Sequence, residues 1–78
     1  MIPADVFEVV PIDEMPRYYG QHLFIQLPMR GDQITLRDNT GETRVDLEVL
    51  YVKHWASDEG ATLEPMVSVY TRRWLVPN

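Results

Sequence analysis

The two histidines are the residues of this cysteine-free chain that come closest to metal-binding or proton-transfer chemistry. His22 and His54 lie far apart in the sequence, and neither belongs to an HxH or HExxH pattern. His54 could reach an ion together with Asp58 or Glu59 across one loop, but a solvated acidic loop accounts for the same residues. We therefore expect no metal site and no cofactor.

Two serines and one pair of carboxylates are the remaining candidates for catalysis. Ser57 and Ser68 lie near His54 in the sequence, but neither stands in a G-x-S-x-G nucleophile elbow. Asp46 and Glu48 resemble in type the paired carboxylates of glycosidases. On a strand, however, alternate acidic residues usually form a solvated polar face. We expect no catalytic residues and a non-enzymatic protein.

The segment Arg17-Tyr18-Tyr19 carries the first candidate binding site. Arg and Tyr are enriched among the residues that dominate binding energy in protein interfaces. The segment also falls in a stretch expected to be irregular, and irregular loops on a rigid scaffold often carry recognition. The plainer interpretation is that one tyrosine packs beneath the loop while the other is partly exposed. We predict a protein-binding site here.

A second candidate site combines tryptophans with basic residues near the last two predicted strands. Small barrels bind single-stranded nucleic acid by stacking bases on aromatic rings beside positive charges. If the two strands lie side by side, one cluster could contain Lys53, His54, Trp55, Arg72, Arg73 and Trp74. In the favoured alternative, Trp74 packs in the core and Arg72 pairs across the hairpin with Glu48.

The net charge of −5 opposes nucleic-acid binding and favours a protein partner. A negative surface repels nucleic-acid phosphates and acidic membranes at long range. No apolar run approaches the roughly 20 residues that span a bilayer, and acids interrupt the first apolar residues before a signal-peptide pattern could form. The absence of cysteine favours a cytosolic setting. We expect a cytoplasmic protein without membrane contact.

The 78 residues are enough for one domain, because a second hydrophobic core could not be built from the remainder. We divide this domain, residues 1–78, into an N-terminal strand and helical turn (1–21) and a barrel core (22–76). Prolines bracket the first predicted strand, Asp5–Val10. The helical turn is predicted near residues 13–19, because Asp13, Pro16 and Gly20 suit a helix start and end.

Alternation of apolar and polar residues predicts the next two strands. In His22–Leu27, the three aliphatic residues Leu23, Ile25 and Leu27 share one face. Gly31 and Asp32 make a turn, and Gln33–Arg37 follows with Ile34 and Leu36 facing the core.

The sequence Asp38-Asn39-Thr40-Gly41 predicts a tight hairpin with Gly41 at positive φ. A four-residue loop pairs Leu36 with Thr43 and Ile34 with Val45, which places the apolar residues of both strands on one face.

The longest predicted strand is Thr43–Trp55, and the last is Met66–Trp74. In the former, Val45, Leu47, Val49 and Tyr51 alternate with polar residues. The pattern breaks at Leu50, which indicates a bulge or a sharp bend toward a second sheet. In the latter, Val67 and Val69 share one face.

About five strands, short hairpins and strong bending of the long central strand indicate a small closed or half-closed barrel. The segment 27–36, LPMRGDQITL, is similar to an apolar-Pro-x-x-Gly-Asp-x-apolar-x-apolar segment of many SH3-like barrels, but it is too short to identify a family. The predicted fold class is therefore mainly β, with a single small five-stranded SH3-like or OB-like barrel and a short helical turn near the N-terminus. The predicted function is a non-enzymatic adaptor or structural module that acts through protein contacts. The alternative is a single-stranded nucleic-acid-binding barrel.

Overall fold

The computed structural model describes residues 1–37, 44–55 and 67–74, and within these ranges it contains five β-strands and no helix. The mainly β prediction is confirmed. The strands are β1 (Ile2–Glu8), β2 (Arg17–Phe24), β3 (Gln33–Arg37), β4 (Arg44–His54) and β5 (Val67–Arg73). In the same ranges no helix is long and apolar enough to cross a membrane.

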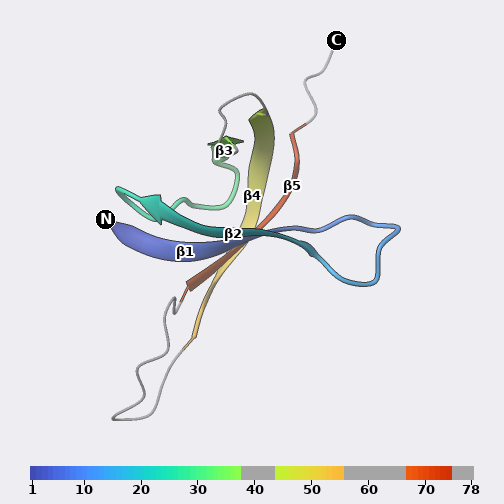
Figure 1. The fold of residues 1–78 in the computed structure, drawn as a ribbon, viewed down its shortest axis with the longest axis horizontal. Helices are drawn as coiled ribbons and strands as arrows, with labels where there is room; N and C mark the ends of the chain where they lie inside the picture. Colours follow the sequence, from blue (N-terminus) through green and yellow to red (C-terminus); the bar gives the residue numbers. More distant parts are fainter. Residues whose placement is uncertain (38–43, 56–66, 75–78) are drawn as a thin grey trace.

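The strands form one mixed sheet in the order β2-β1-β5-β4-β3. The central strands β1 and β5 run parallel, and every other neighbouring pair is antiparallel. Strong twist carries β1 and β2 across the direction of β4 and β5, so that the sheet curls into a half-barrel (Figure 1). β2 and β3 are its two edges.

The helical turn predicted near residues 13–19 is wrong, because β2 begins at Arg17. The connection before it contains a turn in which the Asp13 N–H donates to the Val10 carbonyl at 2.9 Å. Gly20 does have positive φ, 91°, but it serves a β-bulge rather than a helix end. The bulge lies where the pairing of β1 with β2 shifts between Asp5 and Phe7. The first strand also lies closer to the N-terminus than the predicted Asp5–Val10.

The predicted strand His22–Leu27 coincides with the structure only in part, because β2 ends at Phe24. Leu23 and Ile25 are 63% and 87% exposed, whereas Phe24 and Leu27 pack against the core. The β1 pairing sets this orientation, since it places Phe24 opposite Ile2. Leu23, Ile25 and Leu27 therefore do not share one face as predicted, because Leu23 and Ile25 are exposed to solvent whereas Leu27 packs against the core.

β3 has the predicted bounds, and Leu36 on it is buried. Its register with β4 differs from the prediction by two residues, since Leu36 pairs with Val45 and Ile34 with Leu47. A shift of two positions preserves the faces, which is why the predicted core side is still correct. The predicted conformation of Gly41 lies outside the described residues.

The bulge predicted at Leu50 is confirmed. Val49 pairs with Thr71 and Tyr51 with Tyr70, so that Leu50 is the extra residue on β4. After the bulge Val52 packs against the same core as Leu47 and Val49.

The buried hydrophobic side chains of the strands lie on one face of the curled sheet, which we call the inner face. It carries the hydrophobic core, which consists of Ala4, Val6, Leu36, Leu47, Val49 and Val69. Because successive side chains of a strand point to opposite faces, the neighbours of these residues lie on the other side, the outer face.

Candidate binding surface

Four aromatic rings lie side by side across the outer face, and we call them the aromatic row. The register aligns Tyr18 of β2 with Phe7 of β1, Phe7 with Tyr70 of β5, and Tyr70 with Tyr51 of β4. The successive ring centroids are 5.1, 5.1 and 4.7 Å apart. The interplanar angles of 13° and 18° make the last two contacts stacked ones. The row therefore spans four of the five strands.

Strand alternation and two bulges produce this alignment. Val6 and Val69 are buried on the inner face, so their neighbours Phe7 and Tyr70 point outward. The bulges at Gly20 and Leu50 shift the parity of the flanking strands and bring the remaining two tyrosines to the same level. If one of the two bulges were absent, the tyrosine at that end of the row would be displaced along its strand.

The two ends of the aromatic row are open to solvent. Tyr18 and Tyr51 are 59% and 51% exposed, whereas Phe7 and Tyr70 between them are half-buried. The Tyr18 hydroxyl donates to the Asp5 carboxylate at 2.6 Å, and this hydrogen bond raises the pKa of Tyr18. The hydrogen bond and the ring contacts hold Tyr18 in one orientation.

Trp55 extends the aromatic character of this face. Its Nε1 donates to Ser68 Oγ at 2.9 Å, and the Lys53 ammonium lies 3.9 Å from its ring centroid. Ser68 is buried, and its hydroxyl oxygen already accepts this hydrogen bond, which agrees with a structural role for the hydroxyl. The Trp55 ring remains 49% exposed. A cation over an indole ring is the most favourable of the common cation–π pairs.

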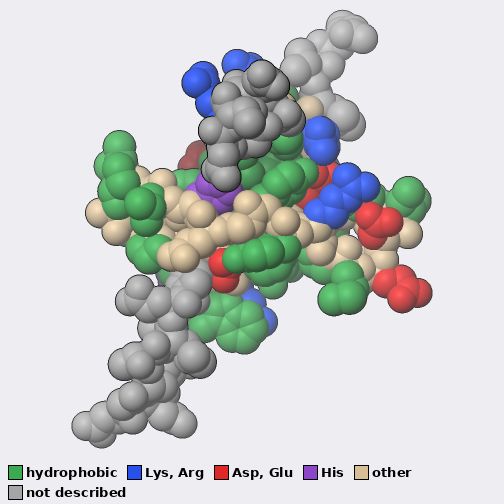
Figure 2. Space-filling model, viewed as in Figure 1, with side chains coloured by type: hydrophobic (Ala, Val, Ile, Leu, Met, Phe, Trp, Pro, Cys, Tyr) green, Lys and Arg blue, Asp and Glu red, His purple; other side chains and the backbone are tan. Residues whose placement is uncertain are grey.

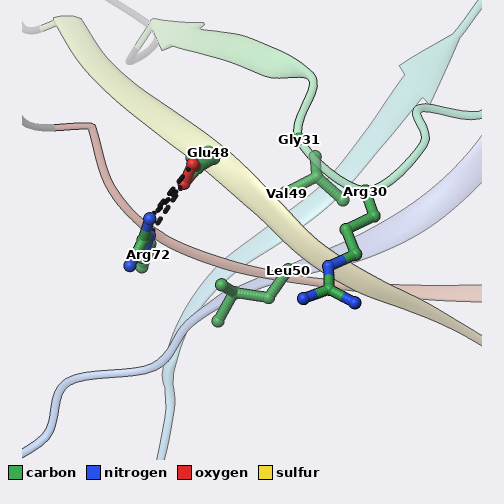
Figure 3. Close-up of a pocket in the computed structure, with 6 residues that line it drawn as sticks. All are labelled: Arg30, Gly31, Glu48, Val49, Leu50 and Arg72. Atoms are coloured by element: carbon green, nitrogen blue, oxygen red, sulfur yellow. Dashed lines mark hydrogen bonds and ion pairs between the residues drawn. The ribbon is translucent and has the colours of Figure 1, made fainter.

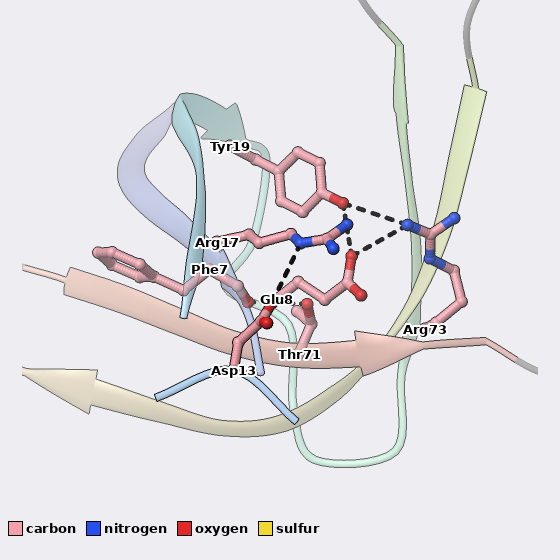
Figure 4. A network of polar contacts seen from close by, with 7 residues as sticks. All are labelled: Phe7, Glu8, Asp13, Arg17, Tyr19, Thr71 and Arg73. Atoms are coloured by element: carbon pink, nitrogen blue, oxygen red, sulfur yellow. Dashed lines mark hydrogen bonds and ion pairs between the residues drawn. The ribbon is translucent and has the colours of Figure 1, made fainter. Parts of the chain in front are cut away.

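A polar network on the inner face contrasts with this open surface (Figure 4). Glu8 is only 5% exposed and accepts hydrogen bonds from the Tyr19 hydroxyl and from Arg73 Nη2, the latter at 3.1 Å. Burial and the neighbouring Glu8 carboxylate raise the pKa of Tyr19. The same carboxylate raises the pKa of Arg73. Thr71 donates to the Phe7 carbonyl at 2.8 Å.

This network ties β1, β2 and β5 together. In the described ranges, no buried side-chain nitrogen or oxygen lacks a hydrogen-bond partner. These same ranges contain no group of three or more His, Asp or Glu residues that could hold a metal ion. The network therefore resembles a structural link between the three strands.

The predicted protein-binding residues do not form a single site. Tyr18 belongs to the aromatic row and Tyr19 to the inner network, because they are neighbours on the same strand. Arg17 lies 3.6 Å from the Asp13 carboxylate in an exposed ion pair. All three residues sit at the edge of the sheet rather than in a loop.

The predicted nucleic-acid cluster is divided into two parts. β4 and β5 do lie side by side, but their antiparallel register pairs Lys53 with Ser68 and Arg72 with Glu48. Four residues of strand, about 13 Å, therefore separate these two pairs. The exposed His54 and Trp55 lie with Lys53, whereas the half-buried Trp74 lies with Arg72 and Arg73.

Both arginines of the second part are engaged in ion pairs. Arg72 Nε and Nη2 donate to the two carboxylate oxygens of Glu48 at 2.8 and 3.2 Å, which confirms the alternative pairing across the hairpin. Arg73 faces inward and binds Glu8. Of the six predicted residues, Lys53 and Trp55 contact each other through their side chains at the open outer face.

Sequence reasoning did not find the aromatic row. Phe7, Tyr51 and Tyr70 are scattered through the chain, and they align only through the pairing of β1 with β5 and of β5 with β4. One signal was available: each follows or precedes a valine within a strand, which places it opposite the core.

The chain was compared with known proteins at three levels. No protein-family model, no curated protein and no solved structure matches it.

Proposed function

We propose that this chain is a non-enzymatic binding module that acts through protein–protein contacts and uses the aromatic row as its contact surface. The observation that carries the proposal is the alignment of four rings on the sheet face opposite the core, with both end rings about half exposed. Tyr and Trp are enriched among binding hot spots, and exposed rings in contiguous rows mark interaction surfaces.

Preorganisation supports this role. Each ring of the row contacts its neighbour, and Tyr18 is also held by its hydrogen bond to Asp5. A partner that binds such rings loses little side-chain entropy, since their rotamers are already fixed. Lys53 and the Arg72–Glu48 pair provide charged groups beside the row, as expected of the polar rim that surrounds an interface core.

Two finer predictions belong to this proposal. The half-barrel is a variant of the small SH3-like or OB-like barrel, which its curl and the bulge at Leu50 support. The protein acts in the cytoplasm, which the cysteine-free composition supports. An experimental structure and localisation of a tagged chain test the two statements.

Quantitative affinity capture tests the contact surface. The immobilised chain and its Tyr51→Ala variant are exposed to lysate of the cells that express the protein, and retained proteins are compared by mass spectrometry. We expect the specific partner to be lost with Tyr51→Ala, since truncation of a hot-spot ring costs about 2 kcal/mol or more of binding free energy. The purified partner is then titrated against both variants.

Met29→Ala is the matched control, because Met29 is 69% exposed and lies in the β2–β3 connection rather than in the row. It should bind the partner as the unchanged chain does. Circular dichroism establishes first that each variant is folded. A partner that binds Tyr51→Ala with unchanged affinity would refute the aromatic row as the contact surface.

Single-stranded nucleic acid is the second candidate, and the row itself is the observation that favours it. Bases stack on aromatic rings irrespective of sequence, and Lys53 beside Trp55 adds a positive charge. The net charge of −5 and Asp5 next to Tyr18 oppose it. Fluorescence anisotropy with a labelled oligonucleotide separates the two functions, because phosphate contacts weaken steeply with salt.

A further inference from the structure

A groove lies at the bulge at Leu50. Its positively charged half is on one side of the bulge and its apolar half on the other. Its first half is a pocket of about 230 Å³ between Arg30, Glu48 and Arg72, with Leu50 beside it (Figure 3). Its second half, about 500 Å³, is bounded mainly by the apolar side chains of Val9, Val10, Pro11 and Leu50. Leu50 and Arg72 line both pockets, so the two halves are adjacent.

The groove is positive in a chain that is otherwise acidic. Three arginines and two glutamates line it, which leaves one net positive charge against the overall −5. Arg72 is neutralised by Glu48 and Arg73 by Glu8. Arg30 is exposed, and among residues 1–37, 44–55 and 67–74 it has no ion-pair partner. Arg30 is therefore available to an incoming carboxylate.

The connection between β1 and β2, residues 9–16, has the complementary composition. Its tip exposes two large apolar side chains, Ile12 at 90% and Met15 at 77%, on either side of Asp13 and Glu14. Within the described part of the chain, Asp13 pairs with Arg17 at 3.6 Å, and Glu14 has no ion-pair partner.

The loop is also in a position to reach another molecule. Figure 1 shows it projecting beyond the end of the sheet, and Figure 2 shows acidic and hydrophobic side chains together at that end of the molecule. Exposed aliphatic side chains at the tip of a projecting loop carry an unfavourable hydration cost that burial in an apolar pocket would remove.

We propose that the occupant of the groove is the β1–β2 loop of a second copy of this chain. Glu14 of each copy binds Arg30 of the other, and Ile12 and Met15 enter the apolar half beside Leu50. Val9, Val10 and Pro11 line the groove and form the first part of the same loop, so that the loop tip and the groove adjoin on one surface. That adjacency allows both contacts to form at once around a twofold axis, which gives a closed dimer.

This dimer uses neither Tyr18 nor Tyr51 of the aromatic row, although the Arg72–Glu48 pair borders both the groove and the row. Sedimentation equilibrium tests it with the full chain alone. We expect a concentration-dependent mass that approaches twice 9.1 kDa. Arg30→Glu and Glu14→Arg should each weaken the dimer by about tenfold or more, since each places like charges opposite one another.

Mixing the two variants gives the decisive measurement. In the mixed dimer the acid introduced at position 30 meets the arginine introduced at position 14, and the other contact is the natural Arg30–Glu14 pair. The mixture should therefore regain dimerisation that neither variant shows alone. Arg37→Glu is the control for charge, because it makes the same change at an exposed position of β3 outside the groove. It should leave dimerisation close to that of the natural chain.

Both variants replace exposed side chains without ion-pair partners in the described ranges, and circular dichroism checks that they fold. A chain that stays monomeric at high concentration would overturn the proposal. So would a dimer that both variants form unchanged, or a mixture that shows no recovery. The capture experiment with Tyr51→Ala tests the other proposal by a different residue, because Tyr51 does not line the groove.

Discussion

Tyr18 and Tyr19 are consecutive residues of one strand, yet the structure places them in different environments. Tyr18 points to the outer face, donates to the half-buried Asp5 in a solvent-exposed hydrogen bond, and ends a row of rings. Tyr19 points to the inner face and donates to the buried Glu8, which Arg73 also binds. The Tyr18 side chain stays largely in solvent, whereas the Tyr19 hydroxyl completes a hydrogen-bond network between strands.

The same contrast holds for the two faces of the whole sheet. The inner face buries six aliphatic side chains and satisfies its buried polar atoms. The outer face carries larger side chains but leaves several of them about half exposed. Stability should therefore depend on the inner face, and binding on the outer one. The following predictions test that division.

The largest expected effect comes from a core leucine. Leu47 is fully buried on the inner face, so Leu47→Ala should lower the free energy of unfolding by about 2–5 kcal/mol. Leu23→Ala on the outer side of β2 removes the same atoms from a side chain that is 63% exposed, and should change stability by about 0.5 kcal/mol or less. Urea denaturation measures both; similar losses would contradict the division into faces.

The next effect compares two carboxylates of β1. Glu8→Ala removes the buried acceptor of both the partly buried Tyr19 hydroxyl and the Arg73 guanidinium, and should cost about 1–3 kcal/mol. Asp5→Ala removes only the acceptor of the exposed Tyr18 hydroxyl and should cost less. Denaturation of both variants at neutral pH decides the order. An equal or larger loss with Asp5→Ala would show that the outer face also holds the fold together.

Local patterns were sufficient for β3, β4 and β5 but not for the N-terminal part. Strict alternation identified Gln33–Arg37, and its interruption identified the bulge at Leu50. Near Gly20 the same residue types suit two structures, because a positive φ fits a helix end and a β-bulge equally well. Pairing with β1 decides between them, and no local pattern contains that pairing.

The candidate site depended still more on long-range contacts. Tyr18 was selected from its type and neighbours, but Phe7, Tyr51 and Tyr70 join it only through the order of the strands. The parallel pairing of β1 with β5 connects residues that are more than sixty positions apart in the sequence. Hydrophobic periodicity reports which face a residue occupies, and it carries no information on which strand lies beside it.

A third prediction concerns the coupling between rings of the aromatic row. The stacked pair Tyr51 and Tyr70, with centroids 4.7 Å apart, should have an interaction energy of about 0.5–1.5 kcal/mol in a double-mutant cycle with alanine. The two single variants and the double variant are compared by urea denaturation. Strictly additive losses would mean that the rings are neighbours without mutual stabilisation, and that the row is less preorganised than proposed.

The smallest effect is a pH dependence that separates the two adjacent tyrosines. Burial and Glu8 raise the pKa of Tyr19, so the folded protein holds this proton more tightly than the unfolded chain does. The stabilisation is therefore complete below the unfolded pKa of about 10 and is lost as the pH rises through the folded value. The difference in unfolding free energy between the natural chain and Tyr19→Phe should shrink above pH ~10. Because the pKa of Tyr18 is raised chiefly by its hydrogen bond to Asp5 at an exposed site, Tyr18→Phe should show a weaker trend of the same sign. A Tyr19→Phe difference that stays constant or grows over this range would show that the Tyr19 hydroxyl gains nothing from Glu8, and the contrast between the two tyrosines would then rest on burial alone.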